Sequence, residues 1–268
     1  MKLSSTYRRH FTVFAINRID DLLASCVLNR LYEMVCVYIP FVFFFSPTVN
    51  YFIKKVSRLV VPKGLSIAII MDGNRRYARY AGISRKQGHI LGYSHMHAVL
   101  EYMDIIKCKA AGFFAFGKKN YNRSTEEISD IMEILENAFK DLDDPNKHKN
   151  LLGKVSIVGD LDSMPKHIQP HVQKLNRTGT DKKSCFIFMS YSSLDEYVNE
   201  GTDGHTPEFD IIIRPGGEKR LSDFLLCNSS KNTMLAFLST KWPLLTPVHI
   251  LLVIIKYTLE LSLDSTCQ

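Results

Sequence analysis

The sequence predicts a single α/β domain with a central, mainly parallel β-sheet flanked by helices. Apolar segments of strand length alternate with longer segments whose apolar residues recur at helical spacing, and polar residues or glycine bound each apolar segment. Strands that are apolar throughout are buried on both faces, which is typical of parallel sheets covered by helices. The 268 residues, 46% hydrophobic and 23% charged, suffice for one large globular domain or two small ones.

Five segments are predicted strands and two are predicted helices. The strands are residues 65–70, 110–117, 154–159, 184–191 and 209–214, and the helices are residues 89–109 and 125–142. The second helix begins after Ser124, because a serine side chain caps a helix and Glu126 and Glu127 place negative charge in its first turn. In such sheets ligands gather at the carboxyl ends of strands, so polar residues there are candidate site residues.

The positive charge of the chain is concentrated at its N-terminus. Residues 1–66 carry nine basic and three acidic side chains, which is six of the net charge of +7. Because the rest of the chain is nearly neutral, we predict no nucleic-acid partner. Six scattered cysteines show neither C-x-x-C nor zinc-type spacing, which favours reduced thiols in a cytosol-facing protein.

Residues 1–60 are predicted to form an apolar, helical and basic membrane-associating segment, ahead of the α/β domain at residues 61–268. Its apolar run at 34–45 has twelve residues and contains Pro40, whereas a spanning helix needs about 20. Basic residues flank the run, as in an interfacial anchor. A helix buried on the domain and a span with extended flanks are the alternatives. A signal peptide is disfavoured, since no small-residue cleavage site follows closely.

The first predicted strand ends in "MDGNRRYAR". Asp72 follows the strand, Gly73 permits close backbone approach, and Asn74, Arg75 and Arg76 begin a helix. Amides at a helix N-terminus and nearby guanidinium groups bind phosphate, and a carboxylate there can share a cation with phosphate oxygens. Two further residues add to this site, Arg85 and His89. A solvated basic helix face is the alternative.

The last predicted strand ends in the same pattern. It runs into Arg214, a Pro-Gly-Gly turn and then Glu218, Arg220 and Ser222, followed by a predicted apolar helix. Arginines separated by a flexible glycine pair can hold one diphosphate, and the glutamate can complete a metal site. Past the second strand, Asn120 and Arg123 belong either to a phosphate-contacting loop or to an exposed polar loop.

These segments together resemble the cis-prenyltransferase family, which contains undecaprenyl diphosphate synthases and eukaryotic dehydrodolichyl diphosphate synthases. The motifs fall in the family's order over residues 65–257, and they are "IAIIMDGNRRYAR", "GHILG", "AFGKKNYNR", "IIIRPGGEKRLSDFLL" and "KWP". The resemblance implies an α/β catalytic domain with a hydrophobic tunnel under two long helices. It also implies magnesium-dependent, cis addition of isopentenyl diphosphate to an allylic diphosphate, with farnesyl diphosphate the expected starter and a long-chain dehydrodolichyl diphosphate the product.

The resemblance also implies residue roles. Asp72 would coordinate Mg²⁺ together with diphosphate, and Glu218 would support that metal site. Asn120 would assist proton removal from isopentenyl diphosphate. The apolar faces of the helices at 89–109 and 125–142 would line the tunnel, with ordinary core helices as the alternative. The allylic diphosphate would be held by Gly73, Asn74, Arg75, Arg76, Arg85 and His89. The isopentenyl diphosphate would be held by Arg214, Arg220 and Ser222, with Arg123 close to Asn120.

Four features depart from the family pattern. Gly117 stands where serine is usual, Lys119 stands where an acidic residue is frequent, the segment at 191–209 is short, and Cys227 replaces an aromatic residue. Together they favour the alternative of a catalytically impaired subunit in a heteromeric complex. Asp72 and the paired arginines count against that alternative, because a scaffold does not need them.

The last residues, "LELSLDSTCQ", lack the Arg-x-Gly motif of homodimeric bacterial members. The resemblance to two-component eukaryotic enzymes therefore implies a Nogo-B-receptor-like accessory subunit, with a homodimer as the alternative. The expected location is the cytosolic face of the endoplasmic reticulum membrane. A membrane-attached recruiting protein would explain residues 1–60 but leaves both charged strand ends unexplained.

Overall fold

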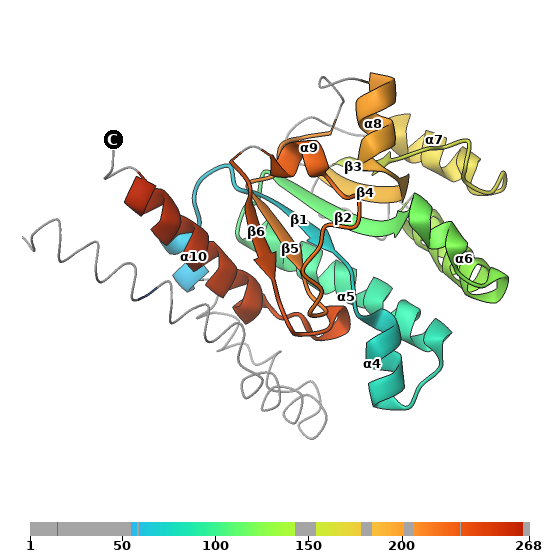
Figure 1. Cartoon of the computed structure of the whole chain (residues 1–268), viewed down its shortest axis with the longest axis horizontal. Coiled ribbons are helices and arrows are strands. Elements are labelled where there is room, and N and C mark those ends of the chain that lie inside the picture. Colours follow the sequence, from blue (N-terminus) through green and yellow to red (C-terminus); the bar gives the residue numbers. More distant parts are fainter. Residues whose placement is uncertain are drawn as a thin grey trace, which may run out of the picture.

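The computed structural model describes residues 15, 55–57, 59–142, 154–177, 184–200, 206–230 and 232–264. These residues form one α/β unit around a six-stranded, wholly parallel sheet (Figure 1). The strand order is β3-β4-β2-β1-β5-β6. The strands are β1 (Ser66–Ile70), β2 (Ala110–Gly117), β3 (Lys154–Val158), β4 (Ser184–Tyr191), β5 (Ile211–Arg214) and β6 (Met234–Phe237). The predicted fold class is confirmed.

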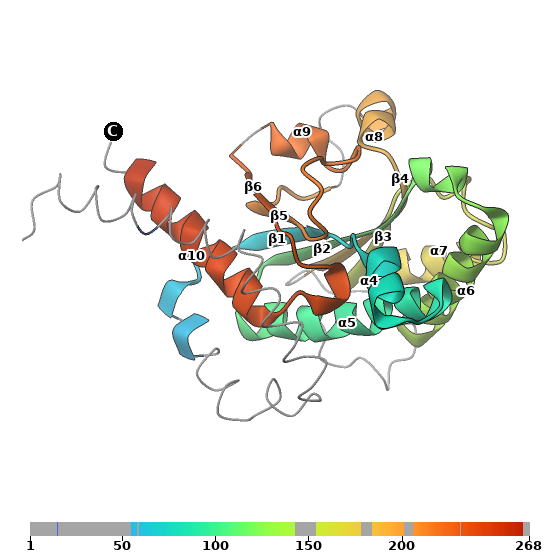
Figure 2. The same cartoon turned by 60° about the horizontal axis from the view of Figure 1, so that its bottom comes forward.

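Helices cover both faces of the sheet. Figure 2 shows α4, α5, α6 and α7 on one side of it and α8 and α9 on the other. The helices are α4 (Asn74–Ala81), α5 (Arg85–Ile105), α6 (Thr125–Leu142), α7 (Gln169–Arg177), α8 (Ser193–Glu200), α9 (Leu226–Ser229) and α10 (Pro247–Asp264), with 3-10 helices at Lys118–Asn122 (η1) and Trp242–Leu244 (η3).

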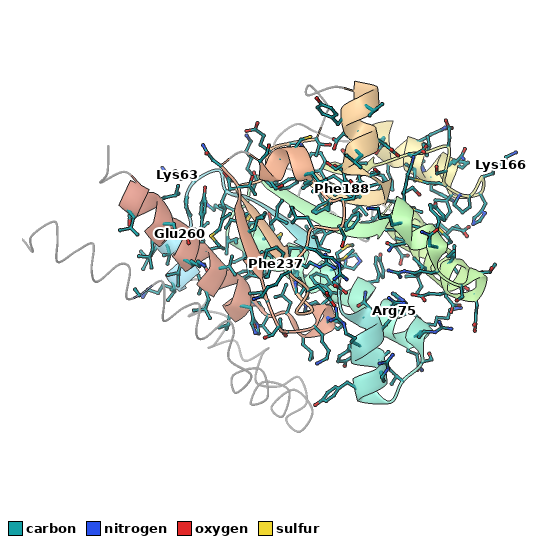
Figure 3. The ribbon with its side chains drawn as sticks, in the orientation of Figure 1. Lys63, Arg75, Lys166, Phe188, Phe237 and Glu260 are labelled. Carbon is teal, nitrogen blue, oxygen red and sulfur yellow. The ribbon has the colours of Figure 1, made fainter. Side chains whose placement is uncertain are left out.

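The sheet is buried on both faces because its central strands are apolar throughout. Ile67 and Ile69 of β1 pack in the cluster that contains Met96 of α5. The alternate residues of β1, Ala68 and Ile70, pack in a second cluster with Phe188, which is labelled in Figure 3. This alternation places the two clusters on opposite faces of the sheet.

Helix α5 begins four residues before the predicted start and ends at Ile105 instead of 109. Its start is set by a capping box. Ser84 Oγ accepts a hydrogen bond from the backbone N–H of Gln87, and the Gln87 side chain accepts one from the backbone N–H of Ser84. Its end precedes Lys107, which adopts a left-handed φ of 59°. Apolar spacing alone does not show either boundary.

The apolar helix predicted after Ser222 is largely wrong, because α9 has only four residues. Ser222, Asp223 and Leu225 all have left-handed φ angles, which interrupt any longer helix. The edge strand β6 was not predicted, and neither were α7, α8 and α10. Strand β6 has four residues and is only partly buried, so it lacks the apolar signal of the central strands.

The predicted membrane-associating segment at 1–60 lies almost entirely outside the described residues. Among the helices that the structure describes, none combines the length and apolar character that crossing a membrane requires. Membrane association therefore stays a prediction.

Two buried histidines should make the fold less stable in acid. Burial lowers the pKa of His95 and of His249 to about 4, from an ordinary value of 6.5. As the pH falls below 6.5, the unfolded chain takes up protons at these positions and the folded chain does not. The free energy of unfolding should therefore decrease by about 1.4 kcal/mol per histidine for each pH unit, and this decrease should stop below about pH 4.

Urea unfolding at pH 7, 6 and 5 measures this dependence. His249→Gln should remove the contribution of that histidine, about 1.4 kcal/mol per pH unit between pH 6.5 and pH 4. His167→Gln should leave the decrease unchanged, because the His167 side chain is 58% exposed. Equal pH dependences in wild type and His249→Gln would contradict the assignment.

Candidate active site

The carboxyl ends of three neighbouring strands, β2, β1 and β5, converge on one pocket of about 830 Å³. All thirteen site residues predicted from the sequence line it. Seven arginines line the pocket against two carboxylates, those of Asp72 and Glu218, so it is strongly positive. Arg75, labelled in Figure 3, lies on α4 at its edge. A positive pocket of this size suits an anion that carries several charges.

Asp72 lies between arginines from two different elements. Its Oδ1 accepts a hydrogen bond from Nη2 of Arg76 at 3.0 Å. Its Oδ2 accepts hydrogen bonds from Nη2 and Nε of Arg214, at 2.9 and 3.3 Å. Arg214 is 5% exposed, and it also donates to Ser222 Oγ at 2.8 Å and to the carbonyl oxygen of Arg220. This arginine therefore joins the ends of β1 and β5. Most of its donors serve the protein itself, which the sequence did not predict.

Two glycines let the backbone come close enough to form this corner. Gly73 precedes α4 with φ of 116°, and a methyl group there would lie 3.0 Å from Cα of Lys241. Gly216 has φ of 101°, and a methyl group there would lie 2.7 Å from Nη2 of Arg76. Larger residues would strain both positions and displace the arginine.

The end of β5 carries a second, more exposed group of charges. Glu218 pairs with Arg220, and its Oε1 lies 3.6 Å from Nη1 of Arg76. Arg76 also donates to the carbonyl oxygen of Gly216. Arg76 thus contacts both carboxylates of the pocket, and it links the two charged strand ends predicted from the sequence.

The third strand end supplies Asn120 and Arg123. Asn120 lies in η1, where its Oδ1 accepts the backbone N–H of Gly117 at 2.9 Å. Arg123 Nη1 donates to Oε1 of Glu127 at 2.9 Å. These bonds fix both side chains at the pocket wall, so the loop is not simply an exposed polar one, and its contact with phosphate stays a prediction.

His89 lies on α5 at the back of the pocket. Burial lowers its pKa, the nearby positive charge of Arg123 lowers it further, and Glu127 acts in the opposite direction. His89 is therefore neutral at pH 7 in the absence of a ligand, and a bound diphosphate would favour its protonation.

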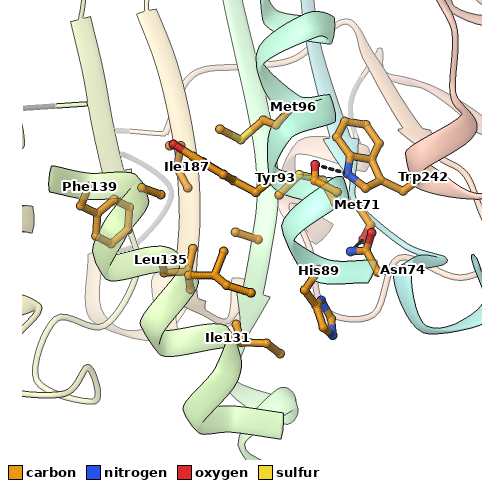
Figure 4. A pocket seen from close by; sticks show the side chains of 14 residues that line it. Met71, Asn74, His89, Tyr93, Met96, Ile131, Leu135, Phe139, Ile187 and Trp242 are labelled. Atoms are coloured by element: carbon orange, nitrogen blue, oxygen red, sulfur yellow. Dashed lines mark hydrogen bonds between the residues drawn. The ribbon is translucent and has the colours of Figure 1, made fainter. Parts of the chain in front are cut away.

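A second, apolar cavity of about 70 Å³ lies between α5, α6 and the sheet (Figure 4). Ile131, Leu135 and Phe139 line it from α6, and Tyr93 and Met96 line it from α5. The two helices predicted to line a hydrophobic tunnel thus line this cavity, and the tunnel itself stays a prediction. At its edge, Trp242 Nε1 donates to the carbonyl oxygen of Gly92 at 2.8 Å. Four residues line both this cavity and the arginine pocket, namely Met71, Asn74, His89 and Ala115.

Three buried polar atoms of residues that line the apolar cavity lack a hydrogen-bond partner among the described residues, and two of them belong to residues of the junction. They are Asn74 Oδ1, His89 Nε2 and the Tyr93 hydroxyl oxygen. Buried polar atoms in native structures are normally satisfied, and exceptions frequently mark ligand sites. The junction is therefore suited to a ligand with a polar head and an apolar chain.

Of the positions that depart from the family pattern, Gly117 has a structural explanation. A methyl group at Gly117 would lie 2.6 Å from Cζ of Phe114, whose ring stacks on Phe224 at 4.6 Å, so a serine does not fit without movement. Lys119 is exposed and does not line the pocket. In α9, Asn228 accepts the backbone N–H of Phe209 at 3.0 Å, while Cys227 is exposed.

Glu127 is the functional residue that sequence analysis missed. It was predicted only as a first-turn acidic residue, but its side chain is 4% exposed and lies within 3.6 Å of three arginines and His89 in the pocket wall. Its spacing of four residues from Arg123 was the one available signal.

The pocket suits Mg²⁺ held jointly with a diphosphate. Proteins commonly bind Mg²⁺ through one or two carboxylates together with substrate phosphates. Among the described residues Asp72 Oδ1 accepts only Arg76 Nη2, which leaves it a further lone pair, and Glu218 lines the same pocket. Within the described part of the chain, no group of three or more metal-binding side chains is assembled. The carboxylates of Asp72 and Glu218 thus fit a metal ion whose remaining ligands are oxygens of the bound diphosphate.

Comparison with known proteins shows the family of this chain. A sequence profile described as putative undecaprenyl diphosphate synthase matches residues 70–203 and 196–261, and its two parts meet inside the short segment at 191–209. A dehydrodolichyl diphosphate synthase from Encephalitozoon cuniculi is 31% identical over 206 residues, covering 76% of this chain and 74% of that protein. A tritrans,polycis-undecaprenyl-diphosphate synthase (geranylgeranyl-diphosphate specific) from Thermoplasma acidophilum is 28% identical over 225 residues, covering 73% and 86%.

A solved structure has the same fold. Lavandulyl diphosphate synthase from Lavandula x intermedia, in complex with dimethylallyl diphosphate, superposes with a TM-score of 0.61 at 20% identity, over 72% of this chain and 94% of that one. With the profile match over most of the chain and the relative at 31% identity, it follows that this chain belongs to the cis-prenyltransferase family.

Proposed function

We propose that this protein condenses isopentenyl diphosphate with an allylic diphosphate to make a long-chain cis-polyprenyl diphosphate. The observation that carries the proposal is the direct junction between an arginine-rich pocket and an apolar cavity. An allylic diphosphate has this same division into a charged head and an apolar tail. The orphaned polar atoms at the junction support the same reading.

In the proposed reaction, the allylic C–O bond breaks and negative charge builds up on the departing diphosphate. Arg75, Arg76 and Arg85 line the pocket where that charge would lie. Stabilising such charge with fixed donors is commonly a large catalytic contribution. Mg²⁺, when bound with Asp72, would add Lewis-acid stabilisation of the same diphosphate.

The second substrate would lie at the end of β5. Arg220 and Ser222 line that side of the pocket, and Arg214 holds Ser222 in place. The double bond of isopentenyl diphosphate attacks the allylic carbon, and a proton then leaves its C2 carbon. Asn120, fixed by its bond to Gly117 N–H, would orient the diphosphate group toward which that proton moves.

The starter is proposed to be farnesyl diphosphate and the product a dehydrodolichyl diphosphate. The name of the Encephalitozoon relative supports this product class, whereas that of the Thermoplasma relative favours a geranylgeranyl starter. The starter assignment is tested by single-turnover condensation of labelled isopentenyl diphosphate, with Mg²⁺, onto dimethylallyl, farnesyl or geranylgeranyl diphosphate. We expect farnesyl diphosphate to have the highest kcat/KM, and preference for dimethylallyl or geranylgeranyl diphosphate would contradict the starter assignment. A folded protein that condenses none of them would favour the non-catalytic subunit.

Tyr93→Ala should lengthen the product by about one isoprene unit or more, because Tyr93 narrows the apolar cavity. Its ring contacts His97 edge-on at 4.8 Å, and its hydroxyl group lacks a hydrogen-bond partner among the described residues. A cavity of about 150 Å³ holds one benzene molecule, so the present cavity must widen as a chain grows. Chromatography of the polyprenols measures the length. Tyr80→Ala is the matched control, since Tyr80 is 52% exposed, and an unchanged length in Tyr93→Ala would contradict this role.

We also propose that residues 1–60 attach the enzyme to the cytosolic face of the endoplasmic reticulum membrane. The basic and apolar composition of this segment supports the proposal. Flotation of the full chain with anionic vesicles, compared with a chain lacking residues 1–54, tests it, and equal flotation of both would contradict it. Adding a Nogo-B-receptor-like subunit to the condensation assay tests the predicted accessory partner.

A further inference from the structure

We propose that Glu127 is a positioning residue, a buried carboxylate that holds the cationic side chains of the diphosphate pocket in place before substrate binds. This inference rests on the proposed function and adds to it. It assigns a role to a side chain that does not line the pocket and therefore does not touch the substrate there.

Each carboxylate oxygen of Glu127 lies near two basic side chains. Oε1 lies 2.9 Å from Nη1 of Arg123 and 3.6 Å from Nε2 of His89. Oε2 lies 3.6 Å from Nη1 of Arg75 and 3.6 Å from Nη1 of Arg85. These partners come from α4, α5 and the loop before α6, so a single carboxylate joins three parts of the pocket wall.

Burial shows which partner is fixed and which ones face the ligand. The Glu127 side chain is 4% exposed, whereas those of Arg75 and Arg85 are 55% and 48% exposed. The three arginines and His89 all line the pocket. The carboxylate is therefore anchored behind the wall, and the guanidinium groups extend from it toward the diphosphate.

The physical reason for such an arrangement is the mutual repulsion of the cations. Three guanidinium groups in a partly buried site repel one another unless an anion lies among them, and a buried carboxylate is itself costly unless it is paired. Glu127 satisfies both conditions in the free protein. The pocket is thus preorganised, and less rearrangement is needed when the diphosphate binds.

A neighbouring glutamate provides a matched control. Glu126 Oε2 lies 3.2 Å from Nη2 of Arg85, but its side chain is 78% exposed. Glu126→Gln and Glu127→Gln each remove one negative charge beside the same arginine. If net charge alone governed binding, both variants would bind diphosphate as tightly as wild type or more tightly.

Titration calorimetry of the full chain with inorganic diphosphate separates these cases. We expect Glu127→Gln to weaken binding about tenfold, the equivalent of one lost charge-assisted hydrogen bond, and Glu126→Gln to stay within about twofold of wild type. With allylic substrate, Glu127→Gln should lower kcat on the order of 100-fold. The KM for isopentenyl diphosphate should change less than about threefold, because its proposed binding residues lie at the end of β5.

Glu127→Asp keeps the charge on a shorter side chain, so its diphosphate affinity should lie between those of wild type and Glu127→Gln. This variant decides the question if thermal unfolding shows that Glu127→Gln does not fold. If Glu127→Gln folds and keeps wild-type affinity and kcat, the inference is overturned. If Glu127→Gln does not fold, wild-type affinity and kcat in Glu127→Asp overturn it instead. If wild type binds diphosphate but never condenses substrates, the proposed function fails, and the affinity comparison still tests Glu127.

Discussion

Asp72→Asn is expected to lower kcat about 1,000-fold while the protein stays folded. Asparagine keeps the shape of the side chain but removes the charge that pairs with Arg76 and Arg214. It also removes the anionic oxygen that would bind Mg²⁺ with the diphosphate. Both losses act on the transition state, in which negative charge on the leaving group is greatest.

The control is Asp160→Asn. Asp160 also forms an ion pair, with Lys118 Nζ at 2.6 Å, and this contact lowers the pKa of Asp160 to about 2. Because it does not line the pocket, its substitution should leave kcat near the wild-type value and cost only stability. Steady-state kinetics and thermal unfolding of both variants make the comparison. A kcat for Asp72→Asn within about tenfold of wild type would contradict the role of Asp72.

Arg214→Lys is expected to lower both stability and activity. Arg214 is 5% exposed and donates to Asp72, Ser222 and the carbonyl oxygen of Arg220. A lysine keeps the charge, but it cannot reproduce these bonds from one planar group. The free energy of unfolding should fall by about 3 kcal/mol, and kcat should fall about 100-fold because both strand ends lose their alignment.

Combining Arg214→Lys with Asp72→Asn shows whether the two residues act as a unit. If they do, the double variant is about as inactive as Asp72→Asn alone. Arg220→Lys is the matched control, since the Arg220 side chain is 63% exposed and pairs with Glu218. It should keep wild-type stability. Losses of kcat that multiply in the double variant would contradict the proposed coupling.

The central strands and the location of the site could be predicted from the sequence. Strands β2 and β4 have the predicted bounds, because buried strands that are apolar throughout give the clearest signal. The polar residues at the ends of β1, β2 and β5 were predicted as site residues, and they converge on one pocket because these strands are neighbours.

What could not be predicted depends on tertiary packing. The left-handed residues before α9 and the partly buried edge strand β6 have no distinctive apolar pattern. The four partners of Glu127 meet only because α5 packs against α6. Likewise, the internal bonds of Arg214 depend on the pairing of β1 with β5, so sequence motifs alone assign it to the substrate.

The most direct test of the account is the configuration of a newly made double bond. Labelled isopentenyl diphosphate is incubated with farnesyl diphosphate, Mg²⁺ and either wild type or Asp72→Asn, and the product is analysed by NMR. The account predicts that wild type makes a polyprenyl diphosphate whose new double bonds are cis. It also predicts that this product is lost with Asp72→Asn and when EDTA is added to wild type. Product with trans double bonds, or equal product from Asp72→Asn, would contradict it.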